Sequence, residues 1–194
     1  YDVNSLIVGG YSSKNNRFEN NFITQCTNGI WAAGNASYPN TGIKIINNKL
    51  GDGTVSSNTS IRGIFISYSA ENASQTQGEI SGNEIQAGAP GTSGFNSLVA
   101  GIEVGNSNYG LQIFKNSIHD INQASTTNGA FGIYFSGTSN NGEISIYNNI
   151  IRSITVTNSN NLFSSPTLSN HGILIAAGAT GTNLRIDYNT IAIN

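Results

Sequence analysis

The stretch Ile43-Lys44-Ile45-Ile46-Asn47-Asn48-Lys49-Leu50 decides the fold, because its pattern recurs along the whole chain. The pattern is apolar, x, apolar, x, x, Asn, x, apolar, and two weaker copies surround Asn21 and Asn83. The anchoring asparagines are Asn21, Asn48, Asn83, Asn116, Asn149 and Asn189, and their spacings are 27, 35, 33, 33 and 40 residues. A period in this range indicates a solenoid or another repeat array.

Two columns of the repeat are apolar in every copy, and a polar column lies beside them. Three residues before the asparagine stand Phe18, Ile45, Ile80, Ile113, Ile146 and Ile186. Two residues after it stand Ile23, Leu50, Ile85, Ile118, Ile151 and Ile191. Alternation with period 2 predicts short strands with one face inward, and it excludes helical repeats of similar length.

The anchoring asparagine lies between two of these strands, where the chain must turn. Asparagine tolerates the left-handed conformation that a sharp corner needs, so we expect it to adopt that conformation. Stacked corners also allow the side-chain amides to bond one another as an asparagine ladder. We therefore assign the six asparagines a structural role.

A second signature, Gly-apolar-x-apolar, alternates with the first. It begins at Gly29, Gly63, Gly101, Gly132 and Gly172. Each repeat then holds three strands: one after the glycine, one before the asparagine and one after it. Three strands and three turns form one coil of a parallel β-helix, and coils stack about 4.8 Å apart. The predicted fold is all-β, with about five to six coils.

On these motifs the chain resembles the right-handed parallel β-helix superfamily of pectate lyases and related carbohydrate-active proteins. The resemblance covers nearly all 194 residues and implies a right-handed coil, as does the crossover rule for parallel strands. The asparagine- and serine-rich composition is also similar to β-helix repeats in large secreted surface proteins of Bacteroidota. In lyases and hydrolases of the superfamily, the active groove follows the outer face of the glycine-led strand.

Composition limits the partners. Charged residues make up 9% of the chain, against about 25% in an average protein, and the net charge is −2. No basic field is present to attract nucleic acid. No signal peptide and no apolar run long enough to enter a membrane is present, and the single Cys26 excludes an internal disulfide. We interpret residues 1–194 as a single β-helix segment of a longer, secreted or cell-surface protein, with further coils at one or both ends.

The outward column of the glycine-led strands is unusually apolar: Trp31, Phe65, Glu103, Tyr134 and Leu174. Aromatic rings in a row can stack on sugar faces, and they can equally pack beneath loops or against another domain. Glu103 is the only acid in the column, whereas glycosidases use a pair of carboxylates. Arg62 and His171 precede glycine-led strands and could reach the rim of this face.

Other chemical signals are weak. His119-Asp120 lacks a nucleophile, and we expect a surface pair on a third strand. Cys26 is expected to be a small core residue. We expect no metal and no cofactor, since no His/Cys metal spacing, repeated calcium motif or phosphate-binding loop occurs. Long polar loops at 51–60, 87–97, 122–128 and 155–170 could form one wall of a groove.

Two functions follow from this sequence. The first is a non-enzymatic structural or adhesive β-helix segment. The alternative is a carbohydrate-active β-helix, either a polysaccharide lyase or hydrolase or a binding protein, that uses the outer face of the glycine-led strands. The candidate ligand-binding residues are those of the outward column.

Overall fold

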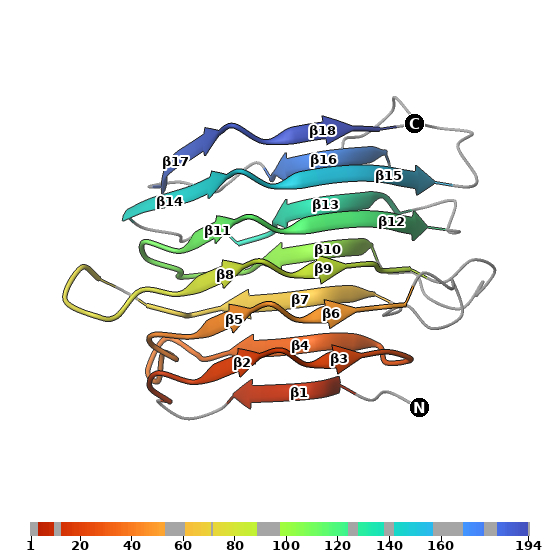
Figure 1. The fold of residues 1–194 in the computed structure, drawn as a ribbon. Helices are drawn as coiled ribbons and strands as arrows, with labels where there is room; N and C mark the ends of the chain where they lie inside the picture. Colours follow the sequence, from red (N-terminus) through yellow and green to blue (C-terminus); the bar gives the residue numbers. More distant parts are fainter. Residues whose placement is uncertain are drawn as a thin grey trace.

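A computed structural model describes residues 4–9, 13–52, 61–70, 72–88, 98–123, 128–137, 142–156, 169–176 and 182–193. In these ranges the chain is all-β and winds through three parallel sheets of six strands each. Figure 1 shows the coils stacked one above another in chain order, from β1 at one end to β18 at the other. Each coil contributes one strand to each sheet, so the predicted architecture of about six coils with three strands per coil is confirmed.

The first sheet contains the glycine-led strands. It is formed by β1 (Asn4–Gly9), β4 (Asn28–Ala33), β7 (Arg62–Ser67), β10 (Val99–Val104), β13 (Ala130–Phe135) and β16 (Asn170–Ile175), each paired with the next in parallel.

The second sheet contains the strands that precede the anchoring asparagines. It is formed by β2 (Arg17–Glu19), β5 (Lys44–Ile46), β8 (Glu79–Ser81), β11 (Gln112–Phe114), β14 (Gly142–Tyr147) and β17 (Thr182–Asp187).

The third sheet contains the strands that follow the asparagines. It is formed by β3 (Phe22–Ile23), β6 (Lys49–Leu50), β9 (Glu84–Ile85), β12 (Ser117–Gln123), β15 (Ile150–Val156) and β18 (Thr190–Ala192).

The inward columns form one continuous core. In the second sheet Ile45, Ile80, Ile113 and Ile146 pair in register and are 0% exposed. The first and third sheets also direct buried aliphatic columns into this core. Cys26 is buried in the same cluster, as predicted. Burying one such side chain contributes roughly 1.5–3 kcal/mol, so the core is the main stabilising element of the stack.

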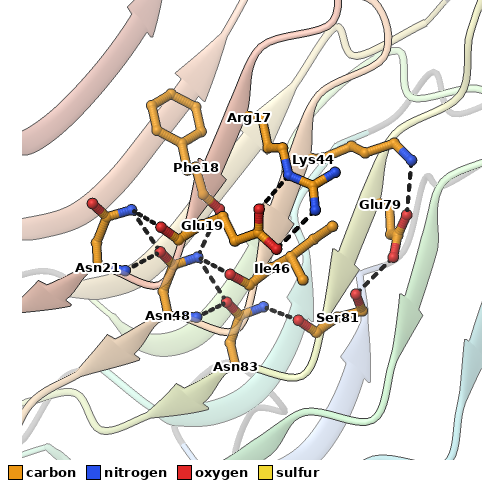
Figure 2. Close-up of polar contacts among 10 residues, drawn as sticks. All are labelled: Arg17, Phe18, Glu19, Asn21, Lys44, Ile46, Asn48, Glu79, Ser81 and Asn83. Carbon is orange, nitrogen blue, oxygen red and sulfur yellow. Dashed lines mark hydrogen bonds and ion pairs between the residues drawn. The ribbon is translucent and has the colours of Figure 1, made fainter.

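The asparagine ladder runs through all six coils. In the first five coils, the Nδ2 of the anchoring asparagine donates to the Oδ1 of the anchoring asparagine in the next coil, at 2.8–3.0 Å. Each backbone N–H donates to that same Oδ1, at 2.9–3.0 Å. Figure 2 shows the ladder at Asn21, Asn48 and Asn83. Buried amides are therefore paired, which removes the cost of taking them out of water.

The left-handed residue is not the anchoring asparagine, so that prediction is wrong. The residue before it has the positive φ in every coil: Asn20, Asn47, Gly82, Lys115, Asn148 and Tyr188, with φ between 54° and 66°. The backbone turns one residue earlier than expected. This leaves the anchoring asparagine free to direct its amide inward into the ladder.

The repeated glycine faces the third-sheet isoleucines at a distance that admits no side chain. A Cβ on Gly101 would lie 2.5 Å from Ile118 Cγ2 and 2.8 Å from the carbonyl oxygen of Gly132. A Cβ on Gly63 or Gly132 would likewise lie within 2.6 Å of the glycine carbonyl oxygen in the next coil and of a third-sheet isoleucine. The glycine column therefore allows two sheets to approach closely.

We expect Gly101→Ala to lower the free energy of unfolding by about 1–3 kcal/mol, because the methyl group overpacks this contact. Chemical denaturation of the purified variant measures the change. Gly82→Asn is the matched control, since Asn47 and Asn148 hold the equivalent left-handed place. Its new Cβ would meet only Asn47 Oδ1 at less than 3 Å, and this atom ends an exposed side chain that can move. It should stay within about 0.5 kcal/mol of the parent. Equal stability of Gly101→Ala and the parent would contradict this explanation of the glycine signature.

Most of the predicted long loops, at 53–60, 89–97, 124–127 and 157–168, lie outside the described residues. Their expected place at the wall of a groove therefore remains a prediction. Two of these loops begin later than predicted, because β12 continues to Gln123 and β15 continues to Val156.

Candidate functional site

The outward column predicted on the glycine-led strands exists as one register column of the first sheet. Trp31 pairs with Phe65, Phe65 with Glu103, Glu103 with Tyr134, and Tyr134 with Leu174. The side chains nevertheless differ in environment. The column divides into an open aromatic part, a buried charged centre and an apolar part.

The open part is the Trp31–Phe65 pair of the second and third coils. Both side chains are partly exposed, and their rings stack with centroids 4.2 Å apart and planes 27° apart. The Arg62 guanidinium lies 5.8 Å from the Trp31 centroid and 5.7 Å from that of Phe65. The contact is a cation–π arrangement, which holds the guanidinium beside the rings.

The charged centre is Glu103, which lies between Phe65 and Tyr134 in the column. It is 5% exposed and therefore not solvated, and its Oε2 forms an ion pair with Arg62 Nε. Its Oε1 accepts a hydrogen bond of 2.7 Å from Ser136 Oγ. Burial makes an unpaired carboxylate very costly, so the neighbouring guanidinium and hydroxyl explain why the charge is tolerated here. The sequence reasoning placed Arg62 at the rim and missed this pairing.

The apolar part is a second cluster outside the main core. Ala100, Phe131 and Tyr134 are buried there, with Leu98, Leu174 and Ala176 against them. Phe131 stacks on Tyr134, with centroids 4.8 Å apart. Burial raises the pKa of the Tyr134 hydroxyl, and the Glu103 carboxylate raises it further. These residues pack with one another rather than forming an open face.

His171 belongs to this apolar part rather than to Glu103. Its ring stacks on Phe131 at 6.0 Å, and its Nε2 lies 2.7 Å from Ser169 Oγ. Of the two basic residues expected near the rim, the structure brings Arg62 to the carboxylate and places His171 against an aromatic ring.

The His119–Asp120 pair lies on β12, as predicted, but His119 is 7% exposed and so is not a surface residue. Its Nδ1 lies 2.7 Å from Asp120 Oδ2 and 3.3 Å from Gln86 Nε2. Its Nε2 lies 3.6 Å from Glu84 Oε1, which is 3.4 Å from Lys49 Nζ. This polar chain links three coils and explains how a buried imidazole is satisfied.

The sequence reasoning did not consider a hollow over the outer face of the second sheet. Its volume is about 410 Å³, and Tyr147, Arg185 and Tyr188 are among the residues that line it. One signal was available, because Tyr188 occupies the position that other copies of the repeat give to asparagine, glycine or lysine.

In comparisons with known proteins, no family model, no curated protein and no solved structure matches the chain. Its assignment as a parallel β-helix therefore depends on the strand order and the ladder. Within the described ranges, no group of three His, Cys, Asp or Glu side chains could hold a metal ion. In those same ranges no helix is long and apolar enough to span a membrane.

Proposed function

We propose that the chain is a non-enzymatic structural or adhesive β-helix segment of a large secreted or cell-surface protein. The observation that carries this proposal is the state of Glu103. It is the only acid in the outward column, and Arg62 and Ser136 occupy both of its oxygens. A carboxylate held in this way is unsuited to proton transfer, because a general acid or base must be in reach of substrate.

The continuity of the stack supports a role as a stiff spacer. The ladder and the aliphatic core pass from coil to coil without interruption among the described residues. In a solenoid each coil contacts only its neighbours, so stiffness depends on every interface being well formed.

Further coils are part of this proposal. Ile186 and Ile191 occupy the inward columns of the sixth coil but are 45% and 47% exposed, whereas their counterparts Ile146 and Ile151 are buried. Another β-helix coil, paired with β16, β17 and β18, would cover them. The resemblance to the pectate-lyase-like superfamily and to Bacteroidota surface repeats agrees with a secreted protein built from more coils.

A second candidate function is carbohydrate recognition or turnover on the first sheet. The partly exposed Trp31–Phe65 pair favours it, because its two aromatic rings leave apolar surface that a sugar can contact. In that case Trp31, Phe65, Glu103, Tyr134 and Leu174 would remain the candidate ligand-binding residues.

A panel of polysaccharides incubated with the isolated chain separates these functions. We expect no new chain ends with any member, because no free catalytic carboxylate is proposed. The heat-unfolded chain provides the blank. Cleavage that is lost in Glu103→Gln would overturn the non-enzymatic proposal. Retention without cleavage that is lost in Trp31→Ala would support the second candidate.

A further inference from the structure

The hollow over the second sheet lies on a different face of the helix from the outward column. It spans the fourth to sixth coils, over β11, β14 and β17, and has a volume of about 410 Å³. Its lining is mainly polar, with two aromatic rings: Gln112, Glu143, Tyr147, Arg185, Asp187 and Tyr188. A hollow of this size matches a small ligand, and its polarity matches one rich in hydroxyl groups.

Tyr188 is the unusual residue of this hollow. It has φ of 54°, in the corner position that the other coils fill with Asn, Gly or Lys. A bulky side chain is disfavoured in the left-handed region. The fold gains little packing in return, because Tyr188 is 84% exposed. Because the Tyr188 ring is exposed and lines the hollow, it is available to contact a ligand there.

Tyr147 supplies a second ring whose orientation is already fixed. It stacks on Phe114 with centroids 5.0 Å apart and planes 2° apart. Its hydroxyl oxygen lies 3.5 Å from Gln112 Oε1. Because these contacts hold the ring before any ligand arrives, binding costs less side-chain entropy.

The charged groups of the hollow already have hydrogen-bond partners among the lining residues. Arg185 Nε donates to Asp187 Oδ2, and Ser145 Oγ donates to Glu143 Oε1 at 3.2 Å. One arginine and two carboxylates give the lining a formal charge of −1. The guanidinium and carboxylate groups offer several donors and acceptors to adjacent sugar hydroxyls. The negative formal charge of the lining disfavours an anionic ligand.

We propose that this hollow binds a neutral saccharide, with Tyr147 and Tyr188 contacting the sugar ring and Asp187, Glu143 and Gln112 bonding its hydroxyls. The proposal deepens the adhesive role and rests on the proposed non-enzymatic function, because the ligand is held and not cleaved. It names a site separate from the Trp31–Phe65 face, so the two faces can be tested apart.

The test is calorimetric titration of the folded chain with neutral oligosaccharides of glucose, xylose, mannose and N-acetylglucosamine, and with an oligogalacturonide as the anionic comparison. We expect binding of at least one neutral series at millimolar concentration. Tyr188→Asn should weaken it about five-fold or more, because a ring contact is lost. This variant keeps the fold, since asparagine occupies the same corner at Asn20, Asn47 and Asn148.

Two control variants locate the binding. Tyr38→Ala removes a 50% exposed tyrosine elsewhere on the surface and should leave the affinity within about two-fold. Trp31→Ala tests the first-sheet face, and loss of binding in this variant would place the ligand there. Lack of binding to every neutral series, tighter binding of the oligogalacturonide, an unaffected Tyr188→Asn variant, or loss on Trp31→Ala would each overturn the proposal. Cleavage of the oligosaccharides would instead contradict the non-enzymatic function.

Discussion

Replacing Asn48 with alanine is expected to lower the free energy of unfolding by about 3–5 kcal/mol. Asn48 is 1% exposed, and its Nδ2 donates to Phe18 O, Ile46 O and Asn83 Oδ1 at 3.0–3.1 Å. Its Oδ1 accepts from the backbone N–H and Nδ2 of Asn21. Alanine removes these bonds and leaves the buried Asn83 Oδ1, and partly buried groups of Asn21, Phe18 and Ile46, with fewer partners. This costs more than the loss of one exposed hydrogen bond.

The neighbouring asparagine provides the control for this variant. Asn47 is exposed and has φ of 54°, so Asn47→Gly should change stability by less than about 0.5 kcal/mol. Asn48→Asp keeps the shape but cannot donate, and it should be destabilised at neutral pH by an amount similar to Asn48→Ala. Urea denaturation measures all three variants. Similar small losses for Asn47→Gly and Asn48→Ala would mean that the ladder adds nothing to stability.

Removing Arg62 should have an effect of comparable size. In Arg62→Met the Glu103 carboxylate is left buried without its cation, and breaking such a pair typically costs about 3–5 kcal/mol. The side chains of Arg62 and Glu103 are 21% and 6% exposed, so solvent cannot replace the lost partner well. We therefore expect Arg62→Met to lower the free energy of unfolding by about 3–5 kcal/mol.

The double variant Arg62→Met/Glu103→Leu separates charge from packing. Leucine already occupies the outward column at Leu174, and removing both charges also removes the desolvation cost. We expect the double variant to recover most of the stability lost by Arg62→Met, which denaturation of both variants would show. A double variant less stable than the single one would contradict a charge-based explanation and favour shape-specific packing around Ser136.

The register of the fold could be predicted from the sequence because each coil repeats the same local pattern. Ile45, Ile80 and Ile113 share one place in the repeat, and a parallel stack puts equal places on top of one another. The outward column was predicted for the same reason. The position of the left-handed corner was missed by one residue, because Asn47 and Asn48 have the same side chain and the sequence does not show which of them has the positive φ.

The details of the candidate site could not be predicted in this way. Arg62 and Glu103 are 41 residues apart, and no pattern within either repeat indicates that their side chains meet. Burial of His119 likewise depends on Gln86 and Glu84 in the preceding coil. These contacts depend on how side chains of different coils extend along the sheet, which the repeat pattern leaves undetermined.

Hydrogen exchange, read coil by coil, tests most directly whether the chain is one continuous rigid stack. The backbone amides of Asn48, Asn83, Asn116 and Asn149 donate to the Oδ1 of the next coil at 2.9–3.0 Å. Amides in a cooperative unit exchange only when that unit opens. We predict that these four exchange slowly and at similar rates, as the neighbouring strand amides do. Rapid exchange at any one of them, with protection retained on either side, would show a break in the stack and contradict its role as a stiff segment.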